Sequence, residues 1–229
     1  MKIGGFQKVS LNEYPGRIAA VVFTQGCNFR CPYCHNPQLV DPALFSDSLA
    51  EDEILDFLER RRGKLDGVSI TGGEPLLQAD LPSFLRKLKA MGYDVKVDTN
   101  GAEPDILDRL IKEDLVRFIA MDVKGPAARY SEIARVQVDM GKIRRSIGII
   151  MGSGIDYEFR TTVVPSLVNP GELADLAKMI KGARRYVLQR FKPSKLLDET
   201  FHNETAITAD QWAALEKEAA RHVKTVFSR

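Results

Sequence analysis

The chain of 229 residues is 44% hydrophobic and 28% charged, which is enough apolar content for one substantial core, and we predict a single domain over residues 1–229. Its 33 Lys and Arg residues nearly balance 31 Asp and Glu residues, so the net charge of +2 gives no electrostatic reason to expect a nucleic acid or an anionic membrane as a partner. No apolar run reaches membrane-spanning length and the N-terminus carries no apolar signal segment, so we expect a cytoplasmic location.

Short β-rich runs alternate along the chain with longer segments of helical periodicity, which is typical of parallel βα units. The strands are predicted at residues 17–24, 67–71, 94–99, 117–123, 157–164 and 185–191. Between them, apolar residues recur at helical spacing in residues 50–58, 81–88 and 172–177. Six parallel strands covered by helices form either an open doubly wound sheet or an incomplete β/α barrel, and periodicity alone does not choose between them.

A last helix is predicted to begin at Thr208, whose hydroxyl can cap it together with Gln211. Its apolar side includes Trp212 and Leu215, and the helix is predicted to continue toward Phe227. The chain is therefore expected to end on a helix that packs against the α/β layers.

The chain has only three cysteines, Cys27, Cys31 and Cys34, in a C-x3-C-x2-C loop after the first predicted strand. Three thiolates can hold three irons of a cubane cluster and leave the fourth iron open to a small chelating molecule. The odd number and the tight spacing do not suit disulfides, which also do not fit a reducing cytoplasm. The loop therefore indicates a reactive iron-sulfur centre.

Two other interpretations of the cysteine loop stay open from the residues alone. His35 follows Cys34, so three thiolates and one imidazole could hold a structural zinc, although such sites usually pair two short hooks and no second hook exists here. Three ordinary buried thiols are the other possibility. A non-catalytic zinc module would also leave the Gly72-Gly73-Glu74 run without a purpose.

Polar motifs follow the first four predicted strands at the points where those strands end. After the cysteine loop come Gly72-Gly73-Glu74-Pro75, Asp98-Thr99-Asn100-Gly101 and Asp122-Val123-Lys124. In both candidate architectures the ligand site is built at the carboxyl ends of the strands. We therefore expect the four motifs to contribute to one site.

With these motifs the sequence resembles the radical S-adenosylmethionine enzymes, and within them the glycyl-radical-enzyme activases. Tyr14-Pro15-Gly16, Thr24-Gln25-Gly26-Cys27 and the later Gln189-Arg190-Phe191-Lys192-Pro193 most resemble the activating proteins of anaerobic ribonucleoside-triphosphate reductase. The resemblance implies an α/β fold, an incomplete (β/α)6 barrel of parallel strands with a C-terminal helix.

The resemblance also implies the reaction and its cofactors. Cys27, Cys31 and Cys34 would be the catalytic residues and metal ligands of a 4Fe-4S cluster whose open iron binds S-adenosylmethionine. Reductive cleavage would give a 5′-deoxyadenosyl radical that takes a hydrogen atom from a glycine Cα of the partner. The implied partners are a glycyl radical enzyme, the class III anaerobic ribonucleotide reductase, and a flavodoxin- or ferredoxin-type electron donor.

Further site residues follow from the resemblance position by position. Gly72 and Gly73 let the backbone approach the ligand, and Glu74 would accept a hydrogen bond from the methionine ammonium; otherwise the run is an ordinary strand-to-helix turn. Tyr33 would lie along the adenine, or else be an amphipathic rim residue. His35 is expected near the cofactor, or else to be a loop residue bonded to backbone.

An oxygen-rich group is implied at the third and fourth strand ends. Asp98, Thr99 and Asp122 match positions that hold a monovalent cation in pyruvate formate-lyase activating enzyme, and the adjoining Asn100 is counted with the cofactor-binding residues. Lys124 matches a lysine that meets the cofactor carboxylate, and Arg160 resembles another cofactor-facing position. The alternatives are capping carboxylates and solvated charges.

One departure separates this sequence from the pyruvate formate-lyase type activases, which carry a histidine near the end of the last strand. This chain has Gln189-Arg190-Phe191-Lys192-Pro193 there, so the histidine contribution to a cation site is missing. Without further cysteines the chain cannot bind an auxiliary cluster. Activation of pyruvate formate-lyase or another glycyl radical enzyme, or a radical reaction on a small molecule, remains the alternative function.

Overall fold

A computed structural model describes residues 1–229, which divide into two compact units. The first unit comprises Met1–Asn28, Asn36–Thr99 and Glu103–Ile119. The second comprises Phe29–His35, Asn100–Ala102 and Ala120–Arg229. The single domain expected from composition stays a prediction.

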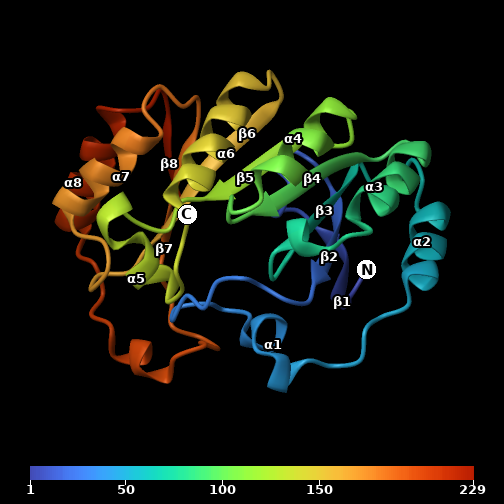
Figure 1. The fold of residues 1–229 in the computed structure, drawn as a ribbon, viewed down its shortest axis with the longest axis horizontal. Coiled ribbons are helices and arrows are strands. Elements are labelled where there is room, and N and C mark those ends of the chain that lie inside the picture. Colours follow the sequence, from blue (N-terminus) through green and yellow to red (C-terminus); the bar gives the residue numbers. More distant parts are fainter. The chain divides into compact units, whose positions relative to one another are not determined.

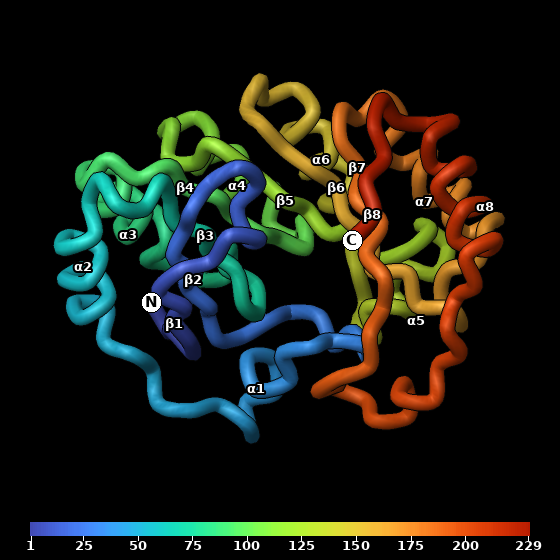
Figure 2. The backbone as a smooth tube through the Cα atoms, turned by 180° about the vertical axis from the view of Figure 1, so that it is seen from behind, coloured from blue at the N-terminus to red at the C-terminus, as the bar shows by residue number.

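The first unit contains the elements from β1 to α4 and the start of β5. They are β1 (Ile3–Ser10), β2 (Ala19–Thr24), α1 (Pro37–Val40), η1 (Pro42–Leu44), α2 (Glu51–Arg60), β3 (Gly67–Gly72), η2 (Pro75–Leu77), α3 (Leu81–Ala90), β4 (Asp94–Thr99), α4 (Pro104–Lys112) and β5 (Phe118–Asp122). Strands β2, β3 and β4 pair in parallel, and β1 pairs antiparallel with β2. Helices α2 and α3 lie outside these strands in both views (Figure 1, Figure 2). The unit thus has the βα winding that its alternating periodicity predicts.

The second unit contains the end of β5 and the elements that follow. They are η3 (Ala127–Arg129), α5 (Tyr130–Ala134), α6 (Met140–Gly152), β6 (Asp156–Val163), α7 (Pro170–Met179), β7 (Tyr186–Arg190), η4 (Glu199–Asn203), α8 (Ala209–Ala220) and β8 (Val226–Ser228). Strands β6, β7 and β8 pair in parallel. Helices α7 and α8 lie side by side (Figure 1).

The order of the strands decides between the two predicted architectures. In the sheet they follow chain order from β1 to β8, without the reversal that marks a doubly wound sheet. The last strand does not pair with the first. Sequential parallel strands that do not close are those of an incomplete β/α barrel, so the predicted fold class is confirmed.

The six predicted strands are all present, with ends shifted by at most a few residues, and the three predicted helices correspond to α2, α3 and α7. The sequence analysis missed two strands, β1 and β8. Helix α8 begins as predicted, with a capping box between Thr208 and Gln211, but it ends at Ala220. The extension of that helix toward Phe227 was wrong, because Val226–Ser228 form β8 instead.

Packing in the first unit explains why its strands read as apolar runs. Val21, Val22, Ile70 and Val97 are fully buried, and α3 covers the strands with a row of buried leucines that includes Leu85. Burial of such side chains contributes about 1.5–3 kcal/mol each relative to exposure. None of the helices in the structure has the length and apolar character that crossing a membrane requires.

Candidate functional site

The cysteine loop and the Gly-Gly-Glu loop leave the sheet side by side. The register of β2 and β3 pairs Thr24 with Gly72, the last residue of each strand. The N–H of Gly73 donates to the Thr24 carbonyl (2.9 Å), and the N–H of Glu74 donates to the Gly26 carbonyl (2.8 Å). The predicted convergence of these two loops is therefore confirmed by hydrogen bonds between their backbones.

The two glycines make this contact possible. Gly72 has a φ of +116°, and a Cβ atom there would lie 2.3 Å from the Thr24 nitrogen. A Cβ atom on Gly73 would lie 2.1 Å from the Gly26 carbonyl oxygen. No side chain fits at either position. The structure thus gives both glycines a role that the sequence analysis missed, which is close approach to the backbone of the cysteine loop.

Glu74 is held in place by its neighbours. Its side chain is buried, and Oε1 accepts hydrogen bonds from the Leu76 N–H (3.1 Å) and from the Thr99 hydroxyl (2.8 Å). The first bond caps η2, as the ordinary turn interpretation expected. The second comes from the end of β4, so two predicted site residues meet in the first unit. Thr99 therefore positions Glu74, a role that sequence reasoning did not assign.

The second half of the cysteine loop is a tight turn in the second unit. The Cys34 N–H donates to the Cys31 carbonyl (3.1 Å). Carbonyls of this turn accept two more bonds, from Leu197 N–H to Cys34 (3.1 Å) and from Asp198 N–H to Pro32 (3.0 Å). Cys31 is buried and Cys34 is half-buried. The backbone between these two thiols is thus fixed by the protein itself.

The fit of an iron-sulfur cluster follows from the donor set. Cys27 belongs to the first unit and the other two cysteines to the second, and no group of three or more metal-ligating side chains is gathered closely enough to hold a metal ion. Burial raises the pKa of the Cys31 thiol, and the nearby Lys124 ammonium opposes that rise. Three cysteines of one loop are the donors that an iron-sulfur cluster requires, and the Lys124 ammonium near Cys31 favours its thiolate form, so the residues fit the group.

Tyr33 and His35 flank Cys34 and differ in exposure. Tyr33 is 5% exposed and its hydroxyl has no hydrogen-bond partner, so the rim interpretation was wrong. Burial raises the pKa of this hydroxyl well above its ordinary value. His35 is exposed and its ring stacks on Phe191, with 5.7 Å between the ring centroids. Phe191 directly follows β7, so an imidazole does lie at the end of that strand, although it comes from the cysteine loop.

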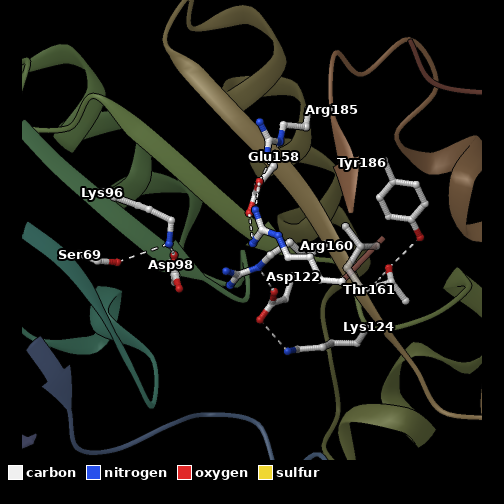
Figure 3. A network of polar contacts seen from close by, with 12 residues as sticks. Ser69, Lys96, Asp98, Asp122, Lys124, Glu158, Arg160, Thr161, Arg185 and Tyr186 are labelled. Atoms are coloured by element: carbon white, nitrogen blue, oxygen red, sulfur yellow. Dashed lines mark hydrogen bonds and ion pairs between the residues drawn. The ribbon is translucent and has the colours of Figure 1, made fainter. Parts of the chain in front are cut away.

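A cluster of three charged side chains lies where β5 ends. Lys124 Nζ is 3.0 Å from Asp122 Oδ2, and Arg160 Nε is 2.8 Å from Asp122 Oδ1 (Figure 3). The backbone joins the same elements, because the Val123 N–H donates to the Arg160 carbonyl (2.8 Å) and the Thr161 hydroxyl donates to the Val123 carbonyl (2.7 Å). Two cations share one carboxylate, so the cluster carries a net positive charge.

Electrostatics keep all members of this cluster ionised. Burial alone would raise the pKa of Asp122, but Arg160 and Lys124 outweigh it and hold that pKa well below its ordinary value. Burial alone would lower the pKa of Lys124, but Asp122 raises it well above the ordinary value. Their side chains are 18% exposed for Lys124 and 10% for Arg160. The interpretation of both as solvated charges was therefore wrong.

The remaining predicted residues at the end of β4 have local partners. Asn100 Oδ1 accepts from the Ala102 N–H (3.0 Å), a turn contact in the second unit. Asp98 is buried in an ion pair with Lys96, and Lys96 Nζ lies 3.4 Å from Ser69 Oγ (Figure 3). Sequence reasoning missed Lys96. Its alternation with valines in β4 normally predicts a side chain in water, so no sequence signal could have placed it inside.

A second buried charge was also missed, on β6. Glu158 is fully buried and lies 3.0 Å from the Arg185 guanidinium and 3.4 Å from that of Arg229. It stands two residues before Arg160, and alternate residues of a strand share one face. The second unit therefore presents a line of paired charges along one face of β6.

Comparison with known proteins agrees with these features. The model of the radical SAM superfamily matches residues 21–180. A protein of Methanocaldococcus jannaschii assigned as a glycyl-radical enzyme activating enzyme is 32% identical over 235 residues, covering 99% of this chain and 95% of that protein. The pyruvate formate-lyase-activating enzyme of Clostridium pasteurianum is 31% identical over 193 residues, covering 80% and 77% of the two chains.

The fold has a solved counterpart in SuiB of Streptococcus suis bound to S-adenosylmethionine. The TM-score is 0.68 at 13% identity, over 91% of this chain, which spans 49% of that longer one. The family model and the relatives lead to one assignment. The chain belongs to the radical S-adenosylmethionine superfamily, and within it to the glycyl-radical-enzyme activating enzymes.

Proposed function

We propose that the chain activates an anaerobic ribonucleoside-triphosphate reductase by forming a radical on a glycine Cα of that enzyme. The choice of this partner rests on the end of β7, where the chain has Gln189 and Arg190 and no histidine follows before Pro193. This run is similar to the reductase activating proteins and unlike the pyruvate formate-lyase type. With three cysteines in one loop, the chain has ligands for one cluster and none for an auxiliary centre.

The cofactors of this family are a 4Fe-4S cluster and S-adenosylmethionine. When bound, they supply radical chemistry in which one electron, one S-adenosylmethionine and one glycine Cα–H give methionine, 5′-deoxyadenosine and a glycyl radical. A flavodoxin- or ferredoxin-type protein would supply the electron. The hydrogen atom that 5′-deoxyadenosine gains is the one that the glycine Cα of the partner loses.

The chain's own residues bind and orient the reactants. Cys27, Cys31 and Cys34 would hold three irons. Glu74, fixed by the Thr99 hydroxyl, would accept a hydrogen bond from the methionine ammonium. The net positive cluster around Asp122 suits a carboxylate, and Lys124 is its more exposed cation.

The test mixes the reconstituted protein, without oxygen, with reductant, S-adenosylmethionine and the anaerobic reductase from the same source. We expect a glycyl-radical doublet in the electron paramagnetic resonance spectrum and one 5′-deoxyadenosine per radical. The matched controls are the reductase with its radical glycine changed to alanine and the activase Cys31→Ala, and neither should give a doublet. A doublet formed on pyruvate formate-lyase but not on the reductase would overturn this choice of partner.

A further inference from the structure

Lys96 is a buried lysine that nothing in the proposed reaction uses. Its side chain is 1% exposed, and it forms an ion pair with Asp98, which is 10% exposed. The two residues are two positions apart on β4 and therefore share one face of the strand. A lone ammonium at this depth would be strongly unfavourable, so its burial depends on the carboxylate.

The surroundings of this ammonium are rich in oxygen. Ser69 is the register partner of Lys96 on β3, and its hydroxyl oxygen lies 3.4 Å from Nζ. Ser69 is itself fully buried. The ammonium of Lys96 thus contacts one carboxylate and one hydroxyl, which are the oxygen ligands that hard cations prefer.

The cation site implied by the resemblance does not fit the contacts of this chain. Of its side chains, Asp98 is paired with Lys96, and the Thr99 hydroxyl donates to Glu74. In the second unit, Asp122 is paired with two cations, Lys124 and Arg160. Each carboxylate of the implied site therefore already has a positive partner from the chain.

We propose that Lys96 is an internal counter-ion that takes the place of a metal cation at Asp98, so that S-adenosylmethionine binds without a monovalent cation. Lys96 acts through Asp98 and is a positioning residue. The proposal rests on the cofactor of the family and not on the identity of the protein partner. Its failure and that of the reductase assignment are therefore separate results.

The first measurement compares potassium chloride with tetramethylammonium chloride at equal ionic strength. The large organic cation has no N–H to donate and cannot approach carboxylate and hydroxyl oxygens as closely as potassium does. For the wild-type protein we expect the same melting temperature and the same S-adenosylmethionine affinity in both salts, measured by scanning fluorimetry and by equilibrium binding without reductant. A wild-type affinity that falls in tetramethylammonium would show that a metal cation is needed and would overturn the proposal.

The second measurement vacates the ammonium position with Lys96→Met. In tetramethylammonium the melting temperature should fall by about 10 °C and the affinity for S-adenosylmethionine by about tenfold. Potassium or ammonium ions should restore most of both losses, because a small cation can then occupy the place beside Asp98. If Lys96→Met unfolds in tetramethylammonium but folds in potassium, this outcome supports the proposal as well.

Two control variants separate this role from ordinary packing. Lys89→Met removes the same charge from the exposed pair with Asp114 and should show no response to the cation. The double variant Lys96→Met/Asp98→Asn removes both charges and should fold without a preference for potassium. If Lys96→Met responds to potassium no more than Lys89→Met does, or fails to fold in every salt, Lys96 is only a structural partner and the proposal is wrong.

Discussion

Two aspartate–lysine pairs, each two residues apart, have opposite electrostatic character. On β4, Lys96 precedes Asp98 within the strand, and the two form a buried pair with no net charge. At the end of β5, Lys124 follows Asp122 beyond the strand, where Arg160 joins the pair from β6. The first pair is neutral and buried, whereas the three side chains of the second together carry one positive charge, and two of them, Lys124 and Asp122, are partly exposed.

This difference follows from where the lysine stands relative to the end of the strand. A side chain inside a strand that is buried on both faces must be neutralised by a neighbour, because water cannot reach it. A side chain beyond the strand end can keep access to solvent and to a ligand, which is where barrel enzymes bind their substrates. The neutral pair therefore compensates a charge that the fold buries, and the positive cluster suits the binding of an anionic group.

The largest effect is expected when the carboxylates of the two pairs are removed one at a time. Asp98→Asn leaves the Lys96 ammonium buried without a counter-charge and should lower the free energy of unfolding by about 3–5 kcal/mol. Asp122→Asn leaves Lys124, which is partly exposed, and Arg160 with an amide oxygen in place of the carboxylate, and it should cost about 1–2 kcal/mol. Urea denaturation of the apoprotein measures both values. Equal losses would mean that the two carboxylates compensate their cations equally, and the proposed difference between the two regions would be wrong.

For the binding of S-adenosylmethionine, the cluster at Asp122 should matter more than the pair of Lys96 and Asp98. If Lys124 binds the methionine carboxylate as proposed, Lys124→Ala removes a charge-assisted hydrogen bond and should weaken S-adenosylmethionine binding by about 1.5–3 kcal/mol, about tenfold to a hundredfold. The iron content and the spectrum of the cluster should not change. Lys178→Ala, which breaks an exposed pair with Asp175, is the matched control. Normal binding by Lys124→Ala would remove this residue from the cofactor site.

The sequence predicted those parts of the fold that are apolar and repeated. Strands β2 to β7 could be located because both of their faces are largely buried, so they read as short apolar or alternating runs. Strand β1 could not, since it has two glycines, three exposed residues and an antiparallel place at the edge. Strand β8 has three residues, too few for any periodicity to separate it from the end of a helix.

The motifs predicted candidate site residues, but the sequence did not predict the residues that hold them in place. Glu74 could be named from its motif, but the hydroxyl of Thr99 that holds it is a contact between strands. Lys96 lies in a Val-Lys-Val-Asp run, which normally predicts a strand with one face in water. In this fold that face is also buried, and only the tertiary structure shows that the lysine is inside with Asp98.

The smallest expected effect is the pH dependence of stability that comes from Asp122. The pKa of Asp122 is lower in the folded protein than its ordinary value of about 3.9, because Arg160 and Lys124 outweigh burial. The unfolded state therefore takes up a proton first as the pH falls. The stability that the ionised carboxylate contributes is complete above that ordinary value and is lost at lower pH, with a slope of at most about 1.4 kcal/mol per pH unit.

Urea denaturation of wild-type protein and Asp122→Asn at pH 6, 5, 4 and 3 measures this contribution as the difference between the two proteins at each pH. The difference should stay constant from pH 6 to 5 and shrink from pH 4 to 3, because the asparagine cannot be protonated while the other acidic groups titrate in both proteins. The double variant Lys124→Ala/Asp122→Asn should differ in stability from Asp122→Asn alone by an amount that stays constant from pH 6 to 3. A difference that grows as the pH falls would mean that the folded protein raises the pKa of Asp122, and the two cations would then not govern this carboxylate.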